Sequence, residues 1–255
     1  MRIEGLCIRN IEIGMGMPRI CIPVVKQTAD EILEYIGQIM ELQPDIIELR
    51  MDWYEHIRDA EATQRLLESA RQLAGETVLL FTIRTCNEGG ELTVSVEEYM
   101  NLCRMACESG CIDLLDVEAF MDDQVLMEIT KIAHEKQVYV IGSNHDFEKT
   151  PPEDEITRRL EYMGQQGADI AKIAVMPQTE KDVVTLLQAT TDYYDKGNTK
   201  PIVTMSMGGT GMISRLVGET FGSAITFASG GEVSAPGQIP VGDVRTMLAL
   251  LHKYR

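Results

Sequence analysis

The chain has 255 residues, 44% of them apolar and 25% charged, which is the composition of a soluble globular protein. Its formal net charge of −17 predicts a surface that repels nucleic acid and anionic membranes, so neither is an expected partner. No run approaches the roughly 18 apolar residues of a membrane span. Residues 1–10 carry charges at Arg2, Glu4 and Arg9 and lack the apolar segment of a signal peptide. We therefore expect a cytoplasmic protein.

Short runs rich in β-branched residues alternate along the chain with longer amphipathic segments. Three of the amphipathic segments begin with a capping box, in which Glu follows Thr or Ser by three residues. They start at Thr28, Ser95 and Thr150, and Pro151 at the first helical position strengthens the third. Gly167 is the expected C-cap of that third helix. The expected strands are Arg19–Val25, Asp45–Met51, Val78–Thr85, Ile112–Glu118, Val138–Ser143, Ile170–Val175, Ile202–Ser206 and Ala224–Phe227.

This alternation indicates parallel strands joined by right-handed crossovers. Eight repeats without a polar linker, in a chain near the ~250 residues of a (β/α)8 barrel, predict one such domain over residues 1–255. Residues 1–18 precede the first barrel strand and are expected to form a hairpin that closes the bottom of the barrel. An open doubly wound sheet is the alternative, and it fits less well because no G-x-G-x-x-G follows the first strand.

The six cysteines form no metal-binding pattern. None belongs to a Cys-x-x-Cys pair, and no nearby histidines complete a zinc set. Cys103 and Cys107 lie one helical turn apart, as buried thiols on a core-facing stripe do. We expect structural free thiols and no metal site.

Lys172 lies in the middle of the apolar run Ile170–Met176. Burial strips the ammonium of hydration and favours the neutral amine, which attacks carbonyl groups. The alternative is a solvent-facing lysine on an edge strand. The residues on the other strands distinguish a buried nucleophilic lysine from a surface lysine.

In a barrel of this kind, catalytic side chains come from the carboxyl ends of the strands. Alternate residues of a strand share a face, so the second strand carries Glu48, Arg50 and Asp52 together, and we expect this charged face to point inward. On the third strand Arg84 points inward by the same rule. Asp116 and Glu118 share a face of the fourth, and we interpret them as a buried network paired with Arg50 or Arg84. The alternative for the charged face of the second strand is a surface ion pair.

The fifth strand delivers His145 on its inward face, one βα unit before Lys172. That position favours an acid–base role over a structural one. Glu88 lies on the loop after the third strand, where Gly89 and Gly90 would let it turn toward the barrel mouth. Taken alone, Glu88 is a solvated loop acid.

Two loops at the last strands complete the pattern. A glycine cluster, 208–211, precedes Arg215, and it suits either a phosphate cradle or a loop with room to move. Arg215 could hold a carboxylate through a bidentate pair. Residues 228–240 are rich in Gly, Ser and Pro, which fits a lid with polar tips at Ser234 and Gln238, or a disordered surface loop.

Together these residues closely resemble the type I 3-dehydroquinate dehydratase family, the Schiff-base-forming enzymes of the shikimate pathway. The matching stretches run in the family's order across nearly the whole barrel. They are 48–52, 82–85, 88–90, 143–147, 171–177, 205–207, 213–215 and 234–238. The resemblance implies a (β/α)8 fold, a lyase that acts on a small molecule without metal or organic cofactor, and often a homodimer.

The resemblance also implies roles. Lys172 would form an imine with the ketone of 3-dehydroquinate, His145 would move protons, and Glu88 would orient that histidine. Arg215 would bind the substrate carboxylate. The groups that contact hydroxyls or close the lid would be Glu48, Arg50, Arg84, Ser234 and Gln238. Glycines at 208–209 and 230–231 stand where some members carry charged residues, which leaves loop closure and dimer detail open.

Two other functions compete with a lyase. A Schiff-base aldolase acting on a phosphosugar would need a phosphate site at 208–211. A catalytically silent barrel that binds small anions would bind carboxylates without turnover, and Lys172→Ala would not change that binding.

Overall fold

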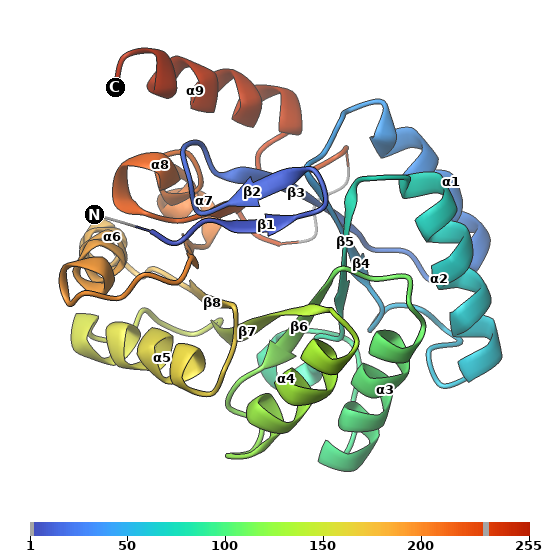
Figure 1. Ribbon diagram of the computed structural model, residues 1–255. Helices are drawn as coiled ribbons and strands as arrows, with labels where there is room; N and C mark the ends of the chain where they lie inside the picture. The colour runs from blue at the N-terminus through green and yellow to red at the C-terminus, as the bar shows by residue number, and fades with distance from the viewer. Residues whose placement is uncertain (1–2, 232–234) are drawn as a thin grey trace.

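The computed structural model describes residues 3–231 and 235–255 of the chain. Its 8-stranded sheet has the order β10-β3-β4-β5-β6-β7-β8-β9, and every neighbouring pair is parallel. Figure 1 shows the helices arranged around this sheet. A bridge between Ile202 and Ser223, next to a 2.8 Å hydrogen bond from Ala224 N to Ile202 O, brings β10 back beside β9. The sheet is therefore a nearly closed (β/α)8 barrel, as predicted.

The elements follow one another in strand–helix alternation. The barrel strands are β3 (Arg19–Val24), β4 (Ile46–Arg50), β5 (Val78–Thr82), β6 (Leu114–Glu118), β7 (Tyr139–Asp146), β8 (Ile170–Val175), β9 (Ile202–Ser206) and β10 (Ile225–Phe227). The helices are α1 (Ala29–Met40), α2 (Ala60–Ala74), η1 (Cys86–Glu88), α3 (Val96–Glu108), α4 (Val125–Glu135), α5 (Glu153–Gln165), α6 (Glu180–Asp195), α7 (Gly208–Gly211), η2 (Met212–Arg215), α8 (Gly218–Phe221) and α9 (Val241–Lys253).

Two strands differ from prediction near the site. β5 ends at Thr82, three residues early, and beyond its end the backbone N–H of Thr85 donates to the Glu118 side chain at 2.8 Å instead of to a strand. β7 continues to Asp146 because it pairs with β8 along its whole carboxyl end, with His145 opposite Ala174. His145 is thus held in a strand and not in a loop.

Two of the predicted helix starts are confirmed. Thr28 accepts from the backbone of Glu31 at 3.3 Å, and the Glu31 carboxylate accepts from Thr28 N at 3.1 Å. Ser95 accepts from Glu98 N at 3.1 Å. Each bond satisfies a backbone donor that the first helical turn leaves unpaired.

The third predicted capping box, at Thr150, is wrong. Helix α5 begins at Glu153, and its N-cap is Pro152, which makes no side-chain cap bond. The Thr150 hydroxyl donates to the carbonyl of Met176 at 3.2 Å and ties the loop before α5 to the end of β8. The other end of the helix is as expected, since Gly167 follows the C-cap with φ of 103°.

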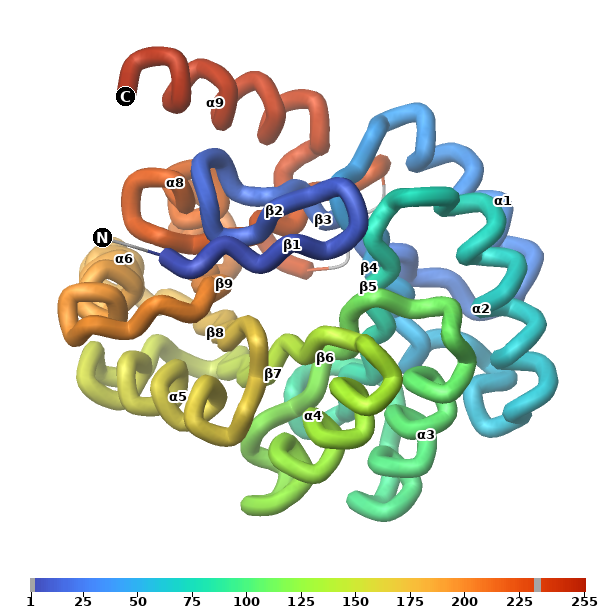
Figure 2. The backbone as a smooth tube through the Cα atoms, in the orientation of Figure 1, coloured from blue at the N-terminus to red at the C-terminus, as the bar shows by residue number. Residues whose placement is uncertain are grey.

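An N-terminal hairpin covers one end of the barrel, as predicted. Strands β1 (Leu6–Ile8) and β2 (Ile11–Ile13) pair antiparallel, and Figure 2 shows them lying across the strands. Ile8 and Ile13 are buried in the same cluster as the inward residues of the barrel. Arg9, in the turn, pairs with Asp113, the residue that precedes β6, at 2.6 Å. The hairpin therefore closes the amino ends of the strands, and the carboxyl ends remain for the site.

The alternation of side chains on each strand separates two buried clusters. On β4, Ile46 belongs to the barrel interior, whereas Ile47 and Leu49 pack under the helices. On β8, Ile170 and Ala174 are interior and Ile173 is outward. The inward assignment of Glu48 and of Lys172 follows from the same alternation.

All six cysteines are free, and four of them, including Cys103 and Cys107, are buried. Burial raises the pKa of the Cys107 thiol to about 12. Within residues 3–231 and 235–255, no helix has both the length and the apolar content that a membrane span requires.

Candidate active site

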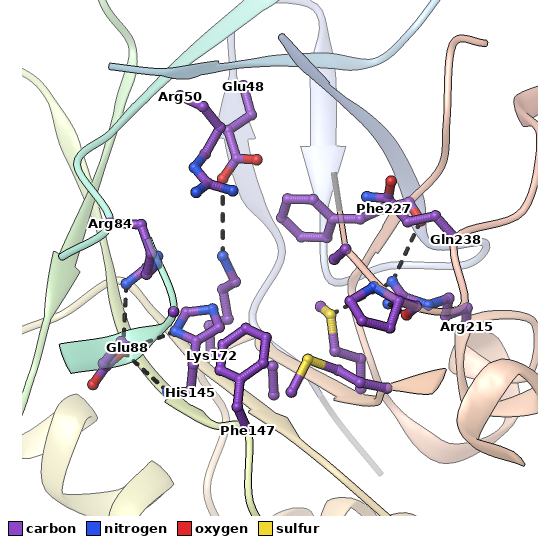
Figure 3. Close-up of a pocket in the computed structure, with 16 residues that line it drawn as sticks. Glu48, Arg50, Arg84, Glu88, His145, Phe147, Lys172, Arg215, Phe227 and Gln238 are labelled. Carbon is purple, nitrogen blue, oxygen red and sulfur yellow. Dashed lines mark hydrogen bonds and ion pairs between the residues drawn. The ribbon is translucent and has the colours of Figure 1, made fainter. Parts of the chain in front are cut away.

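A cavity of about 220 Å³ opens at the carboxyl ends of the barrel strands. Figure 3 shows the side chains that line it. Eight of the nine residues predicted for the site line this cavity, namely Glu48, Arg50, Arg84, Glu88, His145, Lys172, Arg215 and Gln238. Ser234, the ninth, lies outside the described residues.

Lys172 is buried at 3% exposure in the middle of β8 and points into the cavity, so the alternative of a surface lysine is wrong. Its Nζ donates to Asp116 Oδ2 at 3.0 Å and lies 4.0 Å from Glu48 Oε1. The ring of Phe227 covers the amine, with 4.6 Å between Nζ and the ring centroid. The groups in direct contact with the amine are thus carboxylates and an aromatic face.

Arg84 organises the buried carboxylates. Its guanidinium donates to Asp116 at 2.6 Å, to Glu118 at 3.1 Å and to Glu88 at 3.4 Å. Burial alone would raise the pKa of Asp116, but the cations of Arg84 and Lys172 outweigh it and hold that pKa well below its usual range. The prediction that Asp116 and Glu118 pair with Arg84 is confirmed.

Arg50 and Glu48 occupy the wall above Lys172. Arg50 makes a two-point contact with Asp52, at 2.8 Å for both hydrogen bonds. Glu48 accepts from the Thr82 hydroxyl at 3.0 Å. These contacts orient both side chains toward the cavity and leave part of each available to a ligand.

His145 and Glu88 form a hydrogen-bonded pair. Glu88 Oε2 lies 2.8 Å from His145 Nδ1 and accepts the backbone N–H of His145 at 3.0 Å. Burial lowers the pKa of His145 well below its ordinary value, and the nearby cations of Arg84 and Lys172 lower it further. Burial also raises the pKa of Glu88 to about 7, against the pull of Arg84. The imidazole is therefore neutral at neutral pH, and with Nδ1 bonded to Glu88 it presents an unprotonated Nε2.

The loop that carries Glu88 requires glycine at the next position. Gly89 has φ of 80°, and a Cβ there would overlap the ring of Phe147. The close approach lets Phe147 line the cavity beside His145. The alternative of a solvated loop acid is wrong for Glu88, because η1 turns the carboxylate inward, where it is 8% exposed.

Arg215 stands on the opposite side of the cavity from Arg84 and Glu88 (Figure 3). It is 3% exposed, and among the described residues its Nη atoms donate only to backbone carbonyls and a thioether, at 3.2 Å to Pro236 O and 3.5 Å to Phe227 O. Its Nε has no partner within the described part of the chain, and no acidic side chain there offsets its charge. Burial lowers the pKa of Arg215 to about 10. A desolvated but cationic guanidinium of this kind favours binding of an anion.

Residues 235–238, which follow β10 in the chain, lie over this end of the cavity. Gly208 N donates to Pro236 O at 3.1 Å, and Ala235, Pro236 and Gln238 line the cavity. Gly237, with φ of 78°, approaches the backbone of Gly208 so closely that a Cβ would overlap it. The N–H of Gly208 is thus used within the fold and is not available to a phosphate.

Comparisons with known proteins agree with this geometry. The family model described as Type I 3-dehydroquinase matches residues 20–255. The chain belongs to this family. A 3-dehydroquinate dehydratase of Bacillus velezensis is 48% identical over 252 residues, which cover 99% of this chain and 100% of the relative.

Solved structures of relatives share the fold throughout. The crystal structure of type I 3-dehydroquinate dehydratase from Clostridium difficile has a TM-score of 0.96 and 44% identity, covering 100% of both chains. That of 3-dehydroquinate dehydratase from Geobacillus kaustophilus has a TM-score of 0.95 and 40% identity, covering 98% of this chain and 97% of its own. The chain therefore has the barrel architecture of its relatives and is, like them, an enzyme.

Several side chains of this site were given no role in the sequence analysis. Phe147, Met205, Met207 and Phe227 supply apolar walls. The alternation rule places Met205 and Phe227 inward, but apolar residues on an inward face give no signal that separates cavity lining from barrel core. Asn144 was also missed, and it donates to Glu88 Oε1 at 3.0 Å. In the part of the chain that the structure describes, no three His, Cys, Asp or Glu side chains gather so as to hold a metal ion.

Proposed function

We propose that this chain, as a type I 3-dehydroquinase, dehydrates 3-dehydroquinate to 3-dehydroshikimate through an imine on Lys172, in the shikimate pathway. One observation carries the assignment of roles: a buried lysine, a neutral histidine–carboxyl pair and a buried arginine with no acidic partner among the described residues meet in one cavity. These are the parts that imine formation, proton transfer and carboxylate binding require.

The first step is attack of the neutral Lys172 amine on the C3 ketone, with loss of one water. The amine must first give up a proton. Asp116 touches it, yet the low pKa of Asp116 makes that carboxylate a weak acceptor. The unprotonated Nε2 of His145 is the better acceptor, and it returns a proton to the departing hydroxyl as the imine forms.

The second step is elimination. The protonated imine withdraws electrons from C2, so His145 Nε2 removes a C2 proton to give the enamine. The C1 hydroxyl then leaves as water with a proton from the same imidazole, and Glu88 stabilises the imidazolium during the exchange. Hydrolysis of the imine consumes one water, frees Lys172 and releases the conjugated enone. None of these reaction steps requires a metal or an organic cofactor.

Arg215 binds the substrate carboxylate, since it is the one buried cation of the described cavity without a carboxylate neighbour. The ring hydroxyls fall to Glu48, Arg50, Arg84 and Gln238, with Ser234 expected among them. Arg84 serves mainly to hold the carboxylates, because three of them already share its guanidinium.

We also infer the setting of the enzyme, the dimer from the family resemblance and the rest from charge and composition. Residues 1–255 act as one domain, in the cytoplasm, as a homodimer, with a small molecule as the partner and no nucleic acid or membrane. Light scattering after gel filtration tests the dimer directly, and a mass of one chain would refute it.

The experiment that tests the function follows enone absorbance as 3-dehydroquinate is added, with borohydride trapping in parallel. Wild-type enzyme and Lys181→Ala, which removes an exposed lysine of α6, should turn over and should acquire one reduced adduct, at position 172. Lys172→Ala should do neither while keeping the wild-type circular dichroism spectrum. Turnover by Lys172→Ala, or binding without turnover in the wild type, would refute the proposal.

A further inference from the structure

The two oxygens of the Glu88 carboxylate have different surroundings. Oε2 receives the ring Nδ1 and the backbone N–H of His145, together with the long contact from Arg84. Oε1 receives one donor within the described residues, the Asn144 side-chain amide at 3.0 Å. Asn144 is 8% exposed and does not line the cavity. It therefore acts on the carboxylate from behind and fixes which oxygen faces His145.

An asparagine amide can perform this task only if its nitrogen, not its oxygen, faces the carboxylate. Arg159, on helix α5, sets that orientation, because its Nη1 donates to Asn144 Oδ1 at 2.9 Å. A guanidinium has no acceptor, so the amide oxygen must face Arg159 and the NH2 group must face Glu88. Without Arg159 the amide could turn over and direct its oxygen at the carboxylate.

Arg159 is itself held on two further sides. Its Nε donates to Glu155 Oε1 at 2.6 Å, one turn earlier on α5. The Phe120 ring lies 5.8 Å from the guanidinium carbon, and Tyr162 stacks on Phe120. Together, the contacts with Asn144, Glu155 and Phe120 hold the guanidinium plane in one orientation, with Nη1 directed at Asn144.

We propose that Arg159 and Asn144 are positioning residues, which hold Glu88 so that His145 keeps its proton on Nδ1 and a bare Nε2 in the cavity. The inference rests on the proposed function, since it assigns the residues that set the histidine's state in that reaction. It extends the site outward from β7 to the surface of α5. Neither residue touches the substrate space.

The expected pH effect depends on all charges around Glu88. Arg84 from the end of β5 favours its ionised form, whereas Glu118 and Asp116 of β6 disfavour it. From β7, the Asn144 hydrogen bond favours the ionised form. On the far side of His145 stand Lys172 of β8 and Arg50 of β4. Turning the Asn144 amide would replace a favourable contact by a repulsive one and raise the pKa of the pair, so the acidic limb of the kcat profile would move to higher pH.

Helix α5 supplies a matched control. Arg158 and Arg159 both pair with Glu155, at 2.8 Å and 2.6 Å, but Arg158 is 63% exposed and Arg159 22%. Only Arg159 reaches Asn144. We expect Arg159→Met to lower kcat about three- to tenfold, the range of one net hydrogen bond, with KM changed less than twofold. The acidic limb should move up by about half a pH unit, and Arg158→Met should leave kcat, KM and the limb unchanged.

Lysine keeps a cationic donor at the position, so Arg159→Lys should recover most of the lost kcat and return the limb toward its wild-type pH. If Arg159 had only a structural role, its replacement would lower the unfolding temperature without shifting the acidic limb of the pH–kcat profile. Equal kcat and equal pH profiles for Arg159→Met and Arg158→Met would overturn the proposal. A lower unfolding temperature in Arg159→Met with an unmoved limb would overturn it as well.

A second readout needs no turnover. Nitrogen-15 histidine spectra of the whole enzyme, with His145 assigned by its loss in His145→Asn, report which ring nitrogen carries the proton. The wild type and Arg158→Met should show His145 with Nδ1 protonated, and Arg159→Met should show a mixture of the two tautomers. An unchanged His145 tautomer in Arg159→Met would refute the inference. Lack of turnover by the wild type would refute the proposed function instead.

Discussion

Replacing Arg215 by methionine should make the protein more stable and a poorer enzyme. Burial alone lowers the pKa of this guanidinium to about 10, which corresponds to about 3 kcal/mol of lost hydration. Its hydrogen bonds to Pro236 O and Phe227 O are long, at 3.2 Å and 3.5 Å, and offset about 1–2 kcal/mol of that cost. Methionine fills similar space without a charge. We expect a net gain of about 1–2 kcal/mol, or a few degrees in Tm.

The same substitution should cost most of the substrate affinity. A carboxylate that pairs with a buried guanidinium contributes about 2–4 kcal/mol, so KM should rise about 30- to 1000-fold. Thermal unfolding followed by circular dichroism measures the stability, and enone absorbance at several substrate concentrations measures KM. A small change in kcat is expected, since Lys172 and the His145–Glu88 pair stay in place.

Arg84→Met is the comparison, because we expect it to lower the stability of the fold, whereas Arg215→Met should raise it. Arg84 pairs with Asp116 at 2.6 Å and Glu118 at 3.1 Å, both fully or nearly fully buried. Its loss leaves buried carboxylates without a counter-ion and should destabilise the fold by about 3–5 kcal/mol. If Arg215→Met lowered Tm as Arg84→Met does, or left KM within twofold of wild type, the interpretation of Arg215 as an anion receptor would fail.

Three further predictions follow from the site. His145→Ala should lower kcat at least about a hundredfold but still allow borohydride to trap substrate on Lys172, as mass spectrometry would show; full activity would exclude the acid–base role. Because the pKa of Glu88 is raised to about 7, the pair gains a proton as pH falls through that value. The rate should therefore decline below pH 7 in a pH–kcat/KM profile, and a flat profile down to pH 5 would contradict the assignment. Gly89→Ala should destabilise by about 1–3 kcal/mol in chemical unfolding, because φ there is 80° and Phe147 occupies the space of a Cβ; an unchanged midpoint would contradict that reading.

Much of the site could be predicted because strands alternate their faces. Once β4 and β8 were placed in a closed barrel, a period of two forced Glu48 and Lys172 inward without further information. His145 followed by the same rule, although the strand that carries it runs three residues further than predicted. The rule works because hydrogen bonding between neighbouring strands fixes the direction of every side chain.

The contacts between side chains could not be predicted in the same way. Asp116 meets Lys172 across 56 residues of sequence, and neither the distance of 3.0 Å nor the balance against the arginines is encoded locally. The Thr150 cap was wrong for the same reason, since a tertiary acceptor, Met176 O, competes for the hydroxyl. The pairing of Asn144 with Arg159 joins β7 to α5 through atoms that no periodicity brings together. The local sequence pattern determines the face of a strand on which a side chain lies, whereas tertiary packing determines which other side chains it contacts.

We expect the two buried arginines, Arg84 and Arg215, to orient the substrate together. Arg84 is surrounded by carboxylates and contributes no free positive charge to its side of the cavity. Arg215, on the other side, has no carboxylate neighbour among the described residues. A substrate carboxylate turned toward Lys172 would meet Glu48 and Asp116, which lie 4.0 Å and 3.0 Å from the amine, and would be repelled. In the proposed orientation the C1 carboxylate lies at Arg215, the C3 ketone faces Lys172, and C2 lies between the two residues. We therefore expect loss of the hydrogen that this orientation turns toward His145, so that the charge distribution selects the reacting carbon before any covalent bond forms.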